Sequence, residues 1–249
     1  MNNTSLRVNR LSESATIAMA RKARELKSQG QDIISLSLGE PDFNTPDFIK
    51  DAAKEGIDQN YSKYMPVNGY LDLRKAISKK FSRDNDINYT ADQIVVSTGA
   101  KQSIANVVLS CVNPGDEVIV PAPFWVSYEE IIKMAEGTPV FLETSIENDF
   151  KITPSQLKNA ITNKTKMMIY SSPCNPSGSV YSKDELRSLA DVLVNYPLIT
   201  IVSDEIYEHI NFTSKYFSMG AFSDMYNQVV TVNGVSKSFA MTGWRLGYI

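Results

Sequence analysis

The chain has 249 residues, of which 43% are hydrophobic, a composition typical of a soluble globular protein with one large or two small domains. Its net charge of −3, with both signs interspersed and no apolar run of membrane-spanning length, argues against nucleic-acid-binding and membrane-spanning proteins. One histidine and two cysteines in unlike settings, Cys111 and Cys174, indicate neither a metal cluster nor a disulfide.

The N-terminal part predicts a helix, a strand and a loop. The polar first five residues lack the basic-then-apolar pattern of a secretory signal, so we expect a cytoplasmic protein. A helix is predicted over residues 14–29, capped by Ser14, and an apolar strand over residues 32–38. In the turn-rich loop that follows, Gly39 permits close approach of a ligand to the backbone, although a plain turn accounts for it equally well.

The next segment predicts helices over residues 46–59 and about 70–84, separated by a loop that carries Tyr64. A buried strand over residues 93–97 then ends in Thr98-Gly99-Ala100-Lys101, and a helix follows. Free amides and the positive end of a helix dipole favour an anion at such a turn. Neither nucleotide-binding glycine pattern is present, so any phosphate bound here belongs to something smaller than a dinucleotide.

The middle of the chain alternates predicted strands with predicted helices. Trp125 lies at the start of one such helix, where a core aromatic is the default interpretation. Asn175 follows a strand in a Ser-Pro-Cys-Asn-Pro turn, and Ser182 begins a capping box. The strands expected here, after the one that ends at residue 97, cover residues 117–121, 138–142, 166–171 and 197–202, with a helix over residues 154–160.

Two strand ends near the carboxyl terminus carry ionisable side chains. Asp204 and Tyr207 follow the strand over residues 197–202, and a buried carboxylate requires a partner, although a helix cap is the alternative for Asp204. Lys237 follows a predicted strand over residues 228–232. A partly desolvated lysine can attack a carbonyl, whereas a solvated surface lysine is the ordinary alternative. Arg245 is suited to holding a phosphate.

These strand ends, separated by helices, predict an α/β fold with a mostly parallel sheet, whose ligands bind outside the carboxyl ends of the strands. The segment Ser236-Lys237-Ser-Phe-Ala-Met-Thr-Gly-Trp-Arg245-Leu-Gly-Tyr resembles the pyridoxal-phosphate (PLP) lysine signature of the class I aminotransferases, and is most similar to the bacterial aspartate aminotransferases. The resemblance implies the three-layer large domain of the fold type I PLP-dependent transferases over residues 46–249, with residues 1–45 forming an N-terminal arm and part of a small domain.

The resemblance also implies the roles of the site residues. Lys237 would form the Schiff base with PLP and move the substrate's α-proton, and Asp204 would pair with the pyridine nitrogen. The phosphate would be held by Arg245, Ser236 and the loop amides. Tyr64 would reach the phosphate of a partner subunit in a homodimer. The implied cofactor-binding residues are Tyr64, Gly99, Ala100, Lys101, Trp125, Asn175, Asp204, Tyr207, Ser236, Lys237 and Arg245.

The substrates implied by the resemblance are an amino acid, with aspartate favoured, and 2-oxoglutarate, in a ping-pong reaction. The implied substrate-binding residues are Thr16, Gly39, Lys101, Trp125 and Asn175. Lys101 would pair with the distal carboxylate of the substrate. Ser12 stands where relatives that use prephenate have a basic residue, which argues against that activity. No metal is expected.

Two departures from the family pattern stand out. Gly234 replaces a serine that binds the phosphate in many relatives. The chain also ends at Ile249, before the arginine that binds the substrate's α-carboxylate, so we expect a fragment. The alternatives are an aminotransferase of aromatic, prephenate or alanine specificity, a PLP-dependent carbon–sulfur lyase, and a non-catalytic PLP-sensing regulator; the last usually carries a DNA-binding module, which this sequence lacks.

Overall fold

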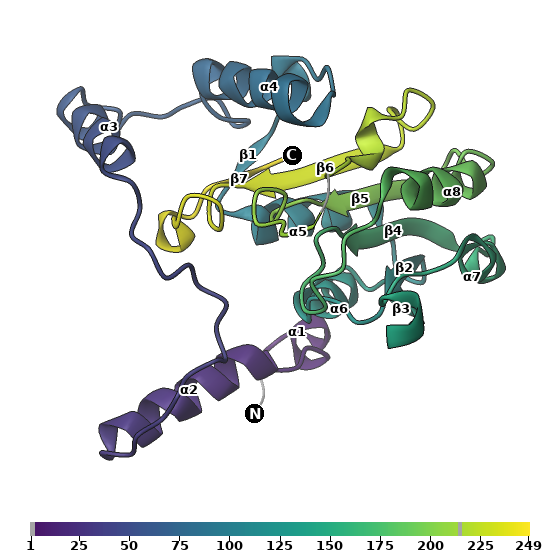
Figure 1. The fold of residues 1–249 in the computed structure, drawn as a ribbon, viewed down its shortest axis with the longest axis horizontal. Helices are drawn as coiled ribbons and strands as arrows, with labels where there is room; N and C mark the ends of the chain where they lie inside the picture. Colours follow the sequence, from purple (N-terminus) through teal and green to yellow (C-terminus); the bar gives the residue numbers. More distant parts are fainter. Residues whose placement is uncertain (1–2, 214–215) are drawn as a thin grey trace.

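The computed structural model describes residues 3–213 and 216–249, and its centre is a seven-stranded sheet in the order β1-β7-β6-β5-β4-β2-β3 (Figure 1). The strand β7 pairs antiparallel with both β1 and β6, and the other pairs are parallel. The mostly parallel sheet expected from the sequence is therefore confirmed. The strands are β1 (Val96–Ser97), β2 (Glu117–Pro121), β3 (Thr138–Leu142), β4 (Thr165–Ser171), β5 (Thr200–Asp204), β6 (Val229–Gly234) and β7 (Gly247–Tyr248).

Helices cover both faces of the sheet and give the expected three layers. In β4, Met167 and Ile169 pack on the side of α5 and α6, while Met168 and Tyr170 pack on the side of α7 and α8. This alternation follows from the two-residue period of a strand, and it buries both faces of the sheet. The helices are α5 (Ala100–Cys111), α6 (Ser127–Met134), α7 (Pro154–Ala160) and α8 (Lys183–Leu193).

The boundaries predicted from the sequence are correct for β2, β3 and α7, and the capping box at Ser182 is present. Two strands differ. The strand predicted over 93–97 is shorter in the structure. Gln93 ends a 3₁₀ helix over Ala91–Gln93, and β1 covers Val96–Ser97, although Val95 also exchanges two backbone hydrogen bonds with Ile249. The strand predicted over 197–202 begins at Thr200 and includes Asp204, which places that carboxylate within β5. The other 3₁₀ helices cover Ile146–Asn148, Met219–Ala221 and Thr242–Trp244.

Four helices precede the sheet: α1 (Leu6–Asn9), α2 (Ala15–Ser28), α3 (Asp47–Asp58) and α4 (Leu71–Asn85). The predicted strand over residues 32–38 is wrong. That segment is an extended connection between α2 and α3 (Figure 1), in which Ile34 and Leu36 are 85% and 90% exposed, and it pairs with no described strand. Ser14 occupies the N-cap of α2, but its side chain makes no capping hydrogen bond.

The carboxyl ends of four strands lie together. Since β1 and β6 each run antiparallel to β7, both run in the same direction, and β4, β5 and β6 are parallel. The ends of β1, β4, β5 and β6 therefore meet at one edge of the sheet, as the sequence predicted.

Among the described residues, none of the helices has the length and apolar character needed to cross a membrane. Within the same residues, no group of histidine, cysteine, aspartate and glutamate side chains has the spacing of a metal site. The thiols of Cys111 and Cys174 are free.

Candidate active site

A cavity of about 590 Å³ lies at the carboxyl ends of β4, β5 and β6, beside the first turn of α5. This is the position at which open parallel sheets bind ligands. Most of the site residues predicted from the sequence line it. They are Thr16, Gly39, Ala100, Lys101, Trp125, Asn175, Asp204, Tyr207, Ser236, Lys237 and Arg245.

The amine of Lys237 lies in this cavity, just beyond β6. Its Nζ donates a hydrogen bond to the carbonyl oxygen of Gly39 at 2.6 Å and lies 5.9 Å from the centre of the Tyr207 ring. Burial lowers the pKa of Lys237, and the positive charge of Arg245 lowers it further, although the carboxylate of Glu40 acts in the opposite direction. A lysine whose charged form is disfavoured in this way is suited to nucleophilic and proton-transfer chemistry.

The carboxylate of Asp204 lies at the end of β5 and is 4% exposed. Its Oδ2 accepts a hydrogen bond from the hydroxyl of Tyr128 at 2.6 Å, and its Oδ1 accepts one from the backbone amide of Ile206 at 3.3 Å. Burial raises the pKa of Asp204 to about 6 despite these two bonds. Among the residues that the structure describes, no cation contributes to its stabilisation, so the carboxylate is available to a positively charged ligand group.

Positive charge collects on the other side of the cavity, where α5 begins. The guanidinium of Arg245 donates to the carbonyl of Thr242 at 2.7 Å and lies against Gly99, where an added Cβ would come within 2.3 Å of Nη2. Burial and the charge of Arg245 lower the pKa of Lys101. The first amides of α5, starting at Ala100, have no acceptor within the helix, so this corner is suited to an anion.

The position of Gly234 explains one departure from the family pattern. An added Cβ there would lie 2.9 Å from the carbonyl oxygen of Leu246 and 3.1 Å from the Cα of Gly247. The close pairing of β6 with β7 therefore excludes a side chain unless the backbone moves. Ser236, two residues on, is buried and lines the cavity, where its side chain is available to a ligand.

Three further side chains form the walls. Burial and the nearby charge of Asp204 raise the pKa of the Tyr207 hydroxyl, and the side chain of Asn175 acts in the opposite direction through a hydrogen bond. Trp125 presents a flat aromatic surface, with Nζ of Lys101 5.0 Å from its ring centre. These groups offer stacking and hydrogen bonding to a planar ring.

The loop that begins at Gly39 closes one side of the cavity by binding to a segment 200 positions away in the chain. Glu40 Oε1 accepts a hydrogen bond from the hydroxyl of Thr242 at 2.5 Å, and the hydroxyl of Thr45 donates to the carbonyl of Ala240 at 2.6 Å. Together with the contact between Lys237 and Gly39, these bonds hold the loop against the residues that follow β6.

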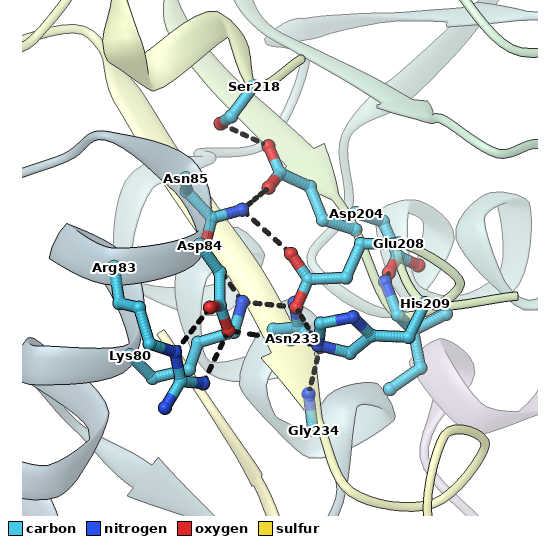
Figure 2. Close-up of polar contacts among 12 residues, drawn as sticks. Lys80, Arg83, Asp84, Asn85, Asp204, Glu208, His209, Ser218, Asn233 and Gly234 are labelled. Carbon is cyan, nitrogen blue, oxygen red and sulfur yellow. Dashed lines mark hydrogen bonds and ion pairs between the residues drawn. The ribbon is translucent and has the colours of Figure 1, made fainter. Parts of the chain in front are cut away.

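Tyr64 and His209 lie away from the cavity, and Gly99 adjoins it through Arg245 without lining it. The side chain of Tyr64 is fully exposed and does not line the cavity of its own chain. His209 lies 3.1 Å from Glu208 and 3.9 Å from Asp84, measured between Nε2 and the nearest carboxylate oxygen, in a separate polar network (Figure 2). The interpretation of His209 as a structural or surface histidine is in keeping with this position.

The network in Figure 2 joins the end of α4 to the segment after β5. The amide of Asn85 donates to Glu208 at 2.7 Å and to Glu205 at 3.3 Å, and Lys80 pairs with Glu208 while donating to Asn85 at 2.7 Å. The carboxylate of Glu205 also accepts bonds from Ser218 and Ser203, yet burial still raises its pKa to about 7. This network therefore fixes the backbone that follows Asp204.

Among the cavity residues that the sequence did not predict, Tyr128 makes a direct contact with a predicted site residue, Asp204. Tyr128, on α6, is 1% exposed and lies three residues after Trp125, so its sequence context is that of an ordinary core aromatic. Only the fold reveals that its hydroxyl reaches Asp204, which lies on a strand 76 positions away in the chain. No pattern in the sequence distinguished this tyrosine from those that simply pack.

The chemistry of these groups defines a ligand. A small anion fits the corner between α5 and Arg245, a protonated nitrogen fits Asp204, and a carbonyl carbon would be within the reach of the amine of Lys237. A flat ring between these points would lie against Trp125. The donor set thus fits a phosphorylated, nitrogen-containing aromatic aldehyde.

Comparisons with known proteins agree with this description. The model of a family described as aminotransferase class I and II matches residues 31–249. The aspartate/prephenate aminotransferase of Nitrosomonas europaea is 50% identical over 246 residues, which are 98% of this chain and 62% of that protein. The protein of the same name from Cereibacter sphaeroides is 48% identical over 96% of this chain and 60% of its own length. The chain thus spans about three fifths of these relatives.

Solved structures give the same fold. Aspartate aminotransferase from Thermus thermophilus with maleate superposes with a TM-score of 0.95 at 43% identity, covering 100% of this chain and 64% of that one. The aspartate aminotransferase from Rhizobium meliloti also gives a TM-score of 0.95, at 39% identity over 98% of this chain and 62% of that one.

Proposed function

The chain belongs to the class I and II aminotransferases, and from this premise we propose that the protein binds pyridoxal 5'-phosphate and transfers the amino group of an amino acid, with aspartate favoured, to 2-oxoglutarate. One observation supports this proposal above the others. A single cavity holds an amine of lowered pKa at Lys237, a buried carboxylate at Asp204 that no described residue pairs with a positive charge, and an anion-binding corner at Arg245.

When bound, PLP supplies a carbonyl carbon for Lys237 and an aromatic ring that accepts electrons from the substrate's α-carbon. Arg245, Ser236 and the first amides of α5 would bind its phosphate, since all of them lie at the same corner of the cavity. Asp204 would hold a proton on the ring nitrogen by ionic pairing, and Asn175 and Tyr207 would orient the ring through its oxygen. Trp125 stacks on the ring, a contact worth about 1 kcal/mol beyond burial.

Lys237 has two roles in this proposal. Its amine would hold the cofactor at the aldehyde carbon, and Nζ, when free, would accept the proton of the substrate's α-carbon and donate it back on the cofactor side. Partial burial disfavours the ammonium form of Lys237 and so lowers its pKa, which favours the role of this amine as a base. Release of the first keto acid before the second binds makes the kinetics ping-pong.

Dicarboxylic substrates are favoured by Lys101, whose amine lies at the cavity wall beside Trp125. The Thermus relative was solved with maleate, which is itself a dicarboxylate. The relatives from Nitrosomonas and Cereibacter are also named for prephenate. Ser12 of this chain supplies no cation, and its backbone amide donates to Glu130 at 2.8 Å, so we propose aspartate rather than prephenate as its substrate.

The Lys101 assignment has a direct test in the protein at its natural length. Replacing Lys101 with serine should raise the KM for aspartate at least tenfold, because one charge-assisted hydrogen bond is lost, and should raise the KM for alanine far less. Lys101→Arg is the matched control, since it keeps the charge. Equal changes in KM for both amino acids would remove Lys101 from substrate recognition.

The proposal extends to assembly and location. We propose a homodimer in which Tyr64 binds the phosphate of the partner subunit, a division near Pro46 between the small domain and the large one, and action in the cytoplasm. The full exposure of Tyr64 favours the homodimer. The two free cysteines are in keeping with a reducing compartment.

The reaction itself is tested by incubating the natural-length protein with aspartate and 2-oxoglutarate. Transamination produces oxaloacetate and glutamate in equal amounts. A carbon–sulfur lyase would instead release pyruvate and ammonia from a cysteine-type substrate, and a PLP-sensing regulator would produce neither. Absence of oxaloacetate from a protein that has bound PLP would contradict the proposed activity.

A further inference from the structure

The hydrogen bond between Tyr128 and Asp204 has a geometry that an ordinary packing contact does not require. The hydroxyl of Tyr128 lies 2.6 Å from Oδ2 of Asp204, within the short range of bonds to a charged acceptor. Tyr128 is 1% exposed and Asp204 is 4% exposed, so water does not weaken the bond. The two residues come from α6 and β5, on separate elements of the fold.

Within residues 3–213 and 216–249, two donors reach this carboxylate. The second, the amide of Ile206, bonds Oδ1 at a longer distance of 3.3 Å. Each carboxylate oxygen accepts about two hydrogen bonds, so both oxygens retain capacity, and Asp204 lines the cavity. Tyr128 is therefore the stronger of the two contacts that favour the charged form of Asp204 before a ligand arrives.

The direction of donation is fixed. Burial, followed by the charge of Asp204, raises the pKa of Tyr128 well above its usual value, so the hydroxyl keeps its proton and donates it. For Asp204, hydrogen bonding to Tyr128 is the largest effect that opposes burial. Removal of this donor would leave the carboxylate with one weak bond in a buried site.

We propose that Tyr128 is a positioning residue that keeps the Asp204 carboxylate ionised and fixed at the cavity wall, so that the shared proton of bound PLP rests on the ring nitrogen. This inference rests on the proposed function. The proton has two places to reside, the ring nitrogen or the carboxylate. Donation from Tyr128 stabilises the negative carboxylate and so favours the proton on nitrogen, which is the state in which the ring accepts electrons.

A structural role is the alternative, because Tyr128 also packs at right angles to Trp125, with ring centres 5.5 Å apart, and belongs to the core between the sheet and α5. Such a role predicts changes in folding but none in the ionisation of Asp204. Titration of Asp204 therefore separates the two interpretations. The other titratable groups that face this carboxylate across the cavity are Tyr207, Lys101, Lys237 and Arg245, and they are unchanged in the variants below.

The test follows the γ-carboxyl carbon of Asp204 by carbon-13 NMR in the cofactor-free, natural-length protein, with the signal assigned from Asp204→Asn. Tyr128→Phe should raise the pKa of Asp204 by about one unit, the shift expected when one hydrogen bond to a charged group is lost. Tyr170→Phe is the matched control. It removes another buried tyrosine hydroxyl, one that contacts Ser203 rather than Asp204, and it should leave this titration unchanged.

A second measurement uses the protein loaded with nitrogen-15-labelled PLP. In Tyr128→Phe the ring-nitrogen resonance should move toward its unprotonated position, and in Tyr170→Phe it should stay at the wild-type position. An unchanged titration of Asp204 in a folded Tyr128→Phe protein would overturn the inference.

If Tyr128→Phe does not fold, 3-fluorotyrosine at position 128 provides the same test, because it keeps the hydroxyl and makes it a stronger donor. It should lower the pKa of Asp204, and an unchanged or raised value would overturn the inference. If the proposed function itself is wrong, the result is different, because the wild-type protein then binds no PLP.

Discussion

Asp204 is a carboxylate that the fold buries without a cationic side chain nearby in the described structure, and this has a measurable effect on stability. Its pKa in the folded protein, about 6, lies above the ordinary value of 3.8. The folded protein therefore binds this proton more tightly than the unfolded chain does. The resulting stabilisation is fully present below about pH 4 and is lost as the pH rises to about 6.

The raised pKa of Asp204 means that its ionised form destabilises the cofactor-free protein. Asp204→Asn should raise the melting temperature at pH 7.5, since it removes a buried charge that destabilises the fold by on the order of 3 kcal/mol. The difference should disappear near pH 4, where Asp204 is protonated. The measurement is thermal unfolding across this pH range, with the exposed Asp191→Asn as the control. Equal melting of wild type and Asp204→Asn at pH 7.5 would contradict the assignment.

At the scale of single residues, the sequence predicted cavity residues such as Lys101, Asn175 and Lys237 because each of them follows a strand end or opens a helix. It missed Tyr128 because the partner of that side chain is determined by the packing of α6 on the sheet rather than by local pattern. It also could not explain Gly234, whose lack of a side chain is required by the close approach of β7.

At the scale of elements, the turn between β1 and α5 depends on a glycine for two reasons. Gly99 has φ of +91°, and a Cβ there would displace the guanidinium of Arg245. Gly99→Ala should therefore weaken PLP binding about 10- to 100-fold, because Arg245 loses its charged hydrogen bonds to the phosphate. Titration of the cofactor-free protein with PLP measures this affinity.

Gly115→Ala is the matched control for that experiment. Gly115 has φ of +87°, so alanine meets a similar backbone penalty of about 1–2 kcal/mol, but an added Cβ there has nothing within 4 Å. Gly115→Ala should lower stability while leaving the affinity for PLP unchanged. Equal loss of affinity in both variants would show that backbone strain, and not Arg245, is responsible.

The contact between α4 and the segment after β5 depends on Asn85, which is 5% exposed and bonds both Glu205 and Glu208 (Figure 2). Asn85→Ala leaves two buried carboxylates with fewer donors, and it should destabilise the protein by about 3 kcal/mol. Thermal or urea unfolding measures the loss. Asn88→Ala, at an exposed asparagine three residues later, should change stability by less than about 0.5 kcal/mol, and an equally small effect at Asn85 would contradict the network's role.

The sequence predicted most elements because their periodicity is strong, and it failed where an apolar pattern had no strand to pair with. Residues 32–38 have the composition of a strand, but in the described structure Ile34 and Leu36 face solvent. An apolar pattern predicts that the side chains are buried, but it does not identify the surface against which they pack. The proposed second subunit is one such surface.

At the scale of the whole molecule, the proposed homodimer makes each cavity depend on two chains. Exposed apolar side chains outside the sheet are in keeping with such a contact. They include Ile34, Leu36, Met65 and Val67. Contact across the dimer would also place Tyr64, which is fully exposed in one chain, beside the phosphate corner of the other.

Mixed dimers test this arrangement. Tyr64→Phe alone should lower the affinity for PLP, and Lys237→Ala alone should abolish covalent binding. In a hybrid of the two, one cavity receives Lys237 from its own chain and Tyr64 from its partner, so it should bind PLP with wild-type affinity. Weak binding in the hybrid, equal to that of Tyr64→Phe dimers, would indicate that Tyr64 acts within its own chain or not at all.

The central claim is that Lys237 is the amine that carries the cofactor. Its test is reduction of the PLP-loaded, natural-length protein with borohydride, followed by digestion and mass spectrometry of the peptides. The account predicts a single pyridoxyl group on Lys237 and none after Lys237→Arg. Absence of the label from Lys237, or its presence on another lysine such as Lys101, would contradict it.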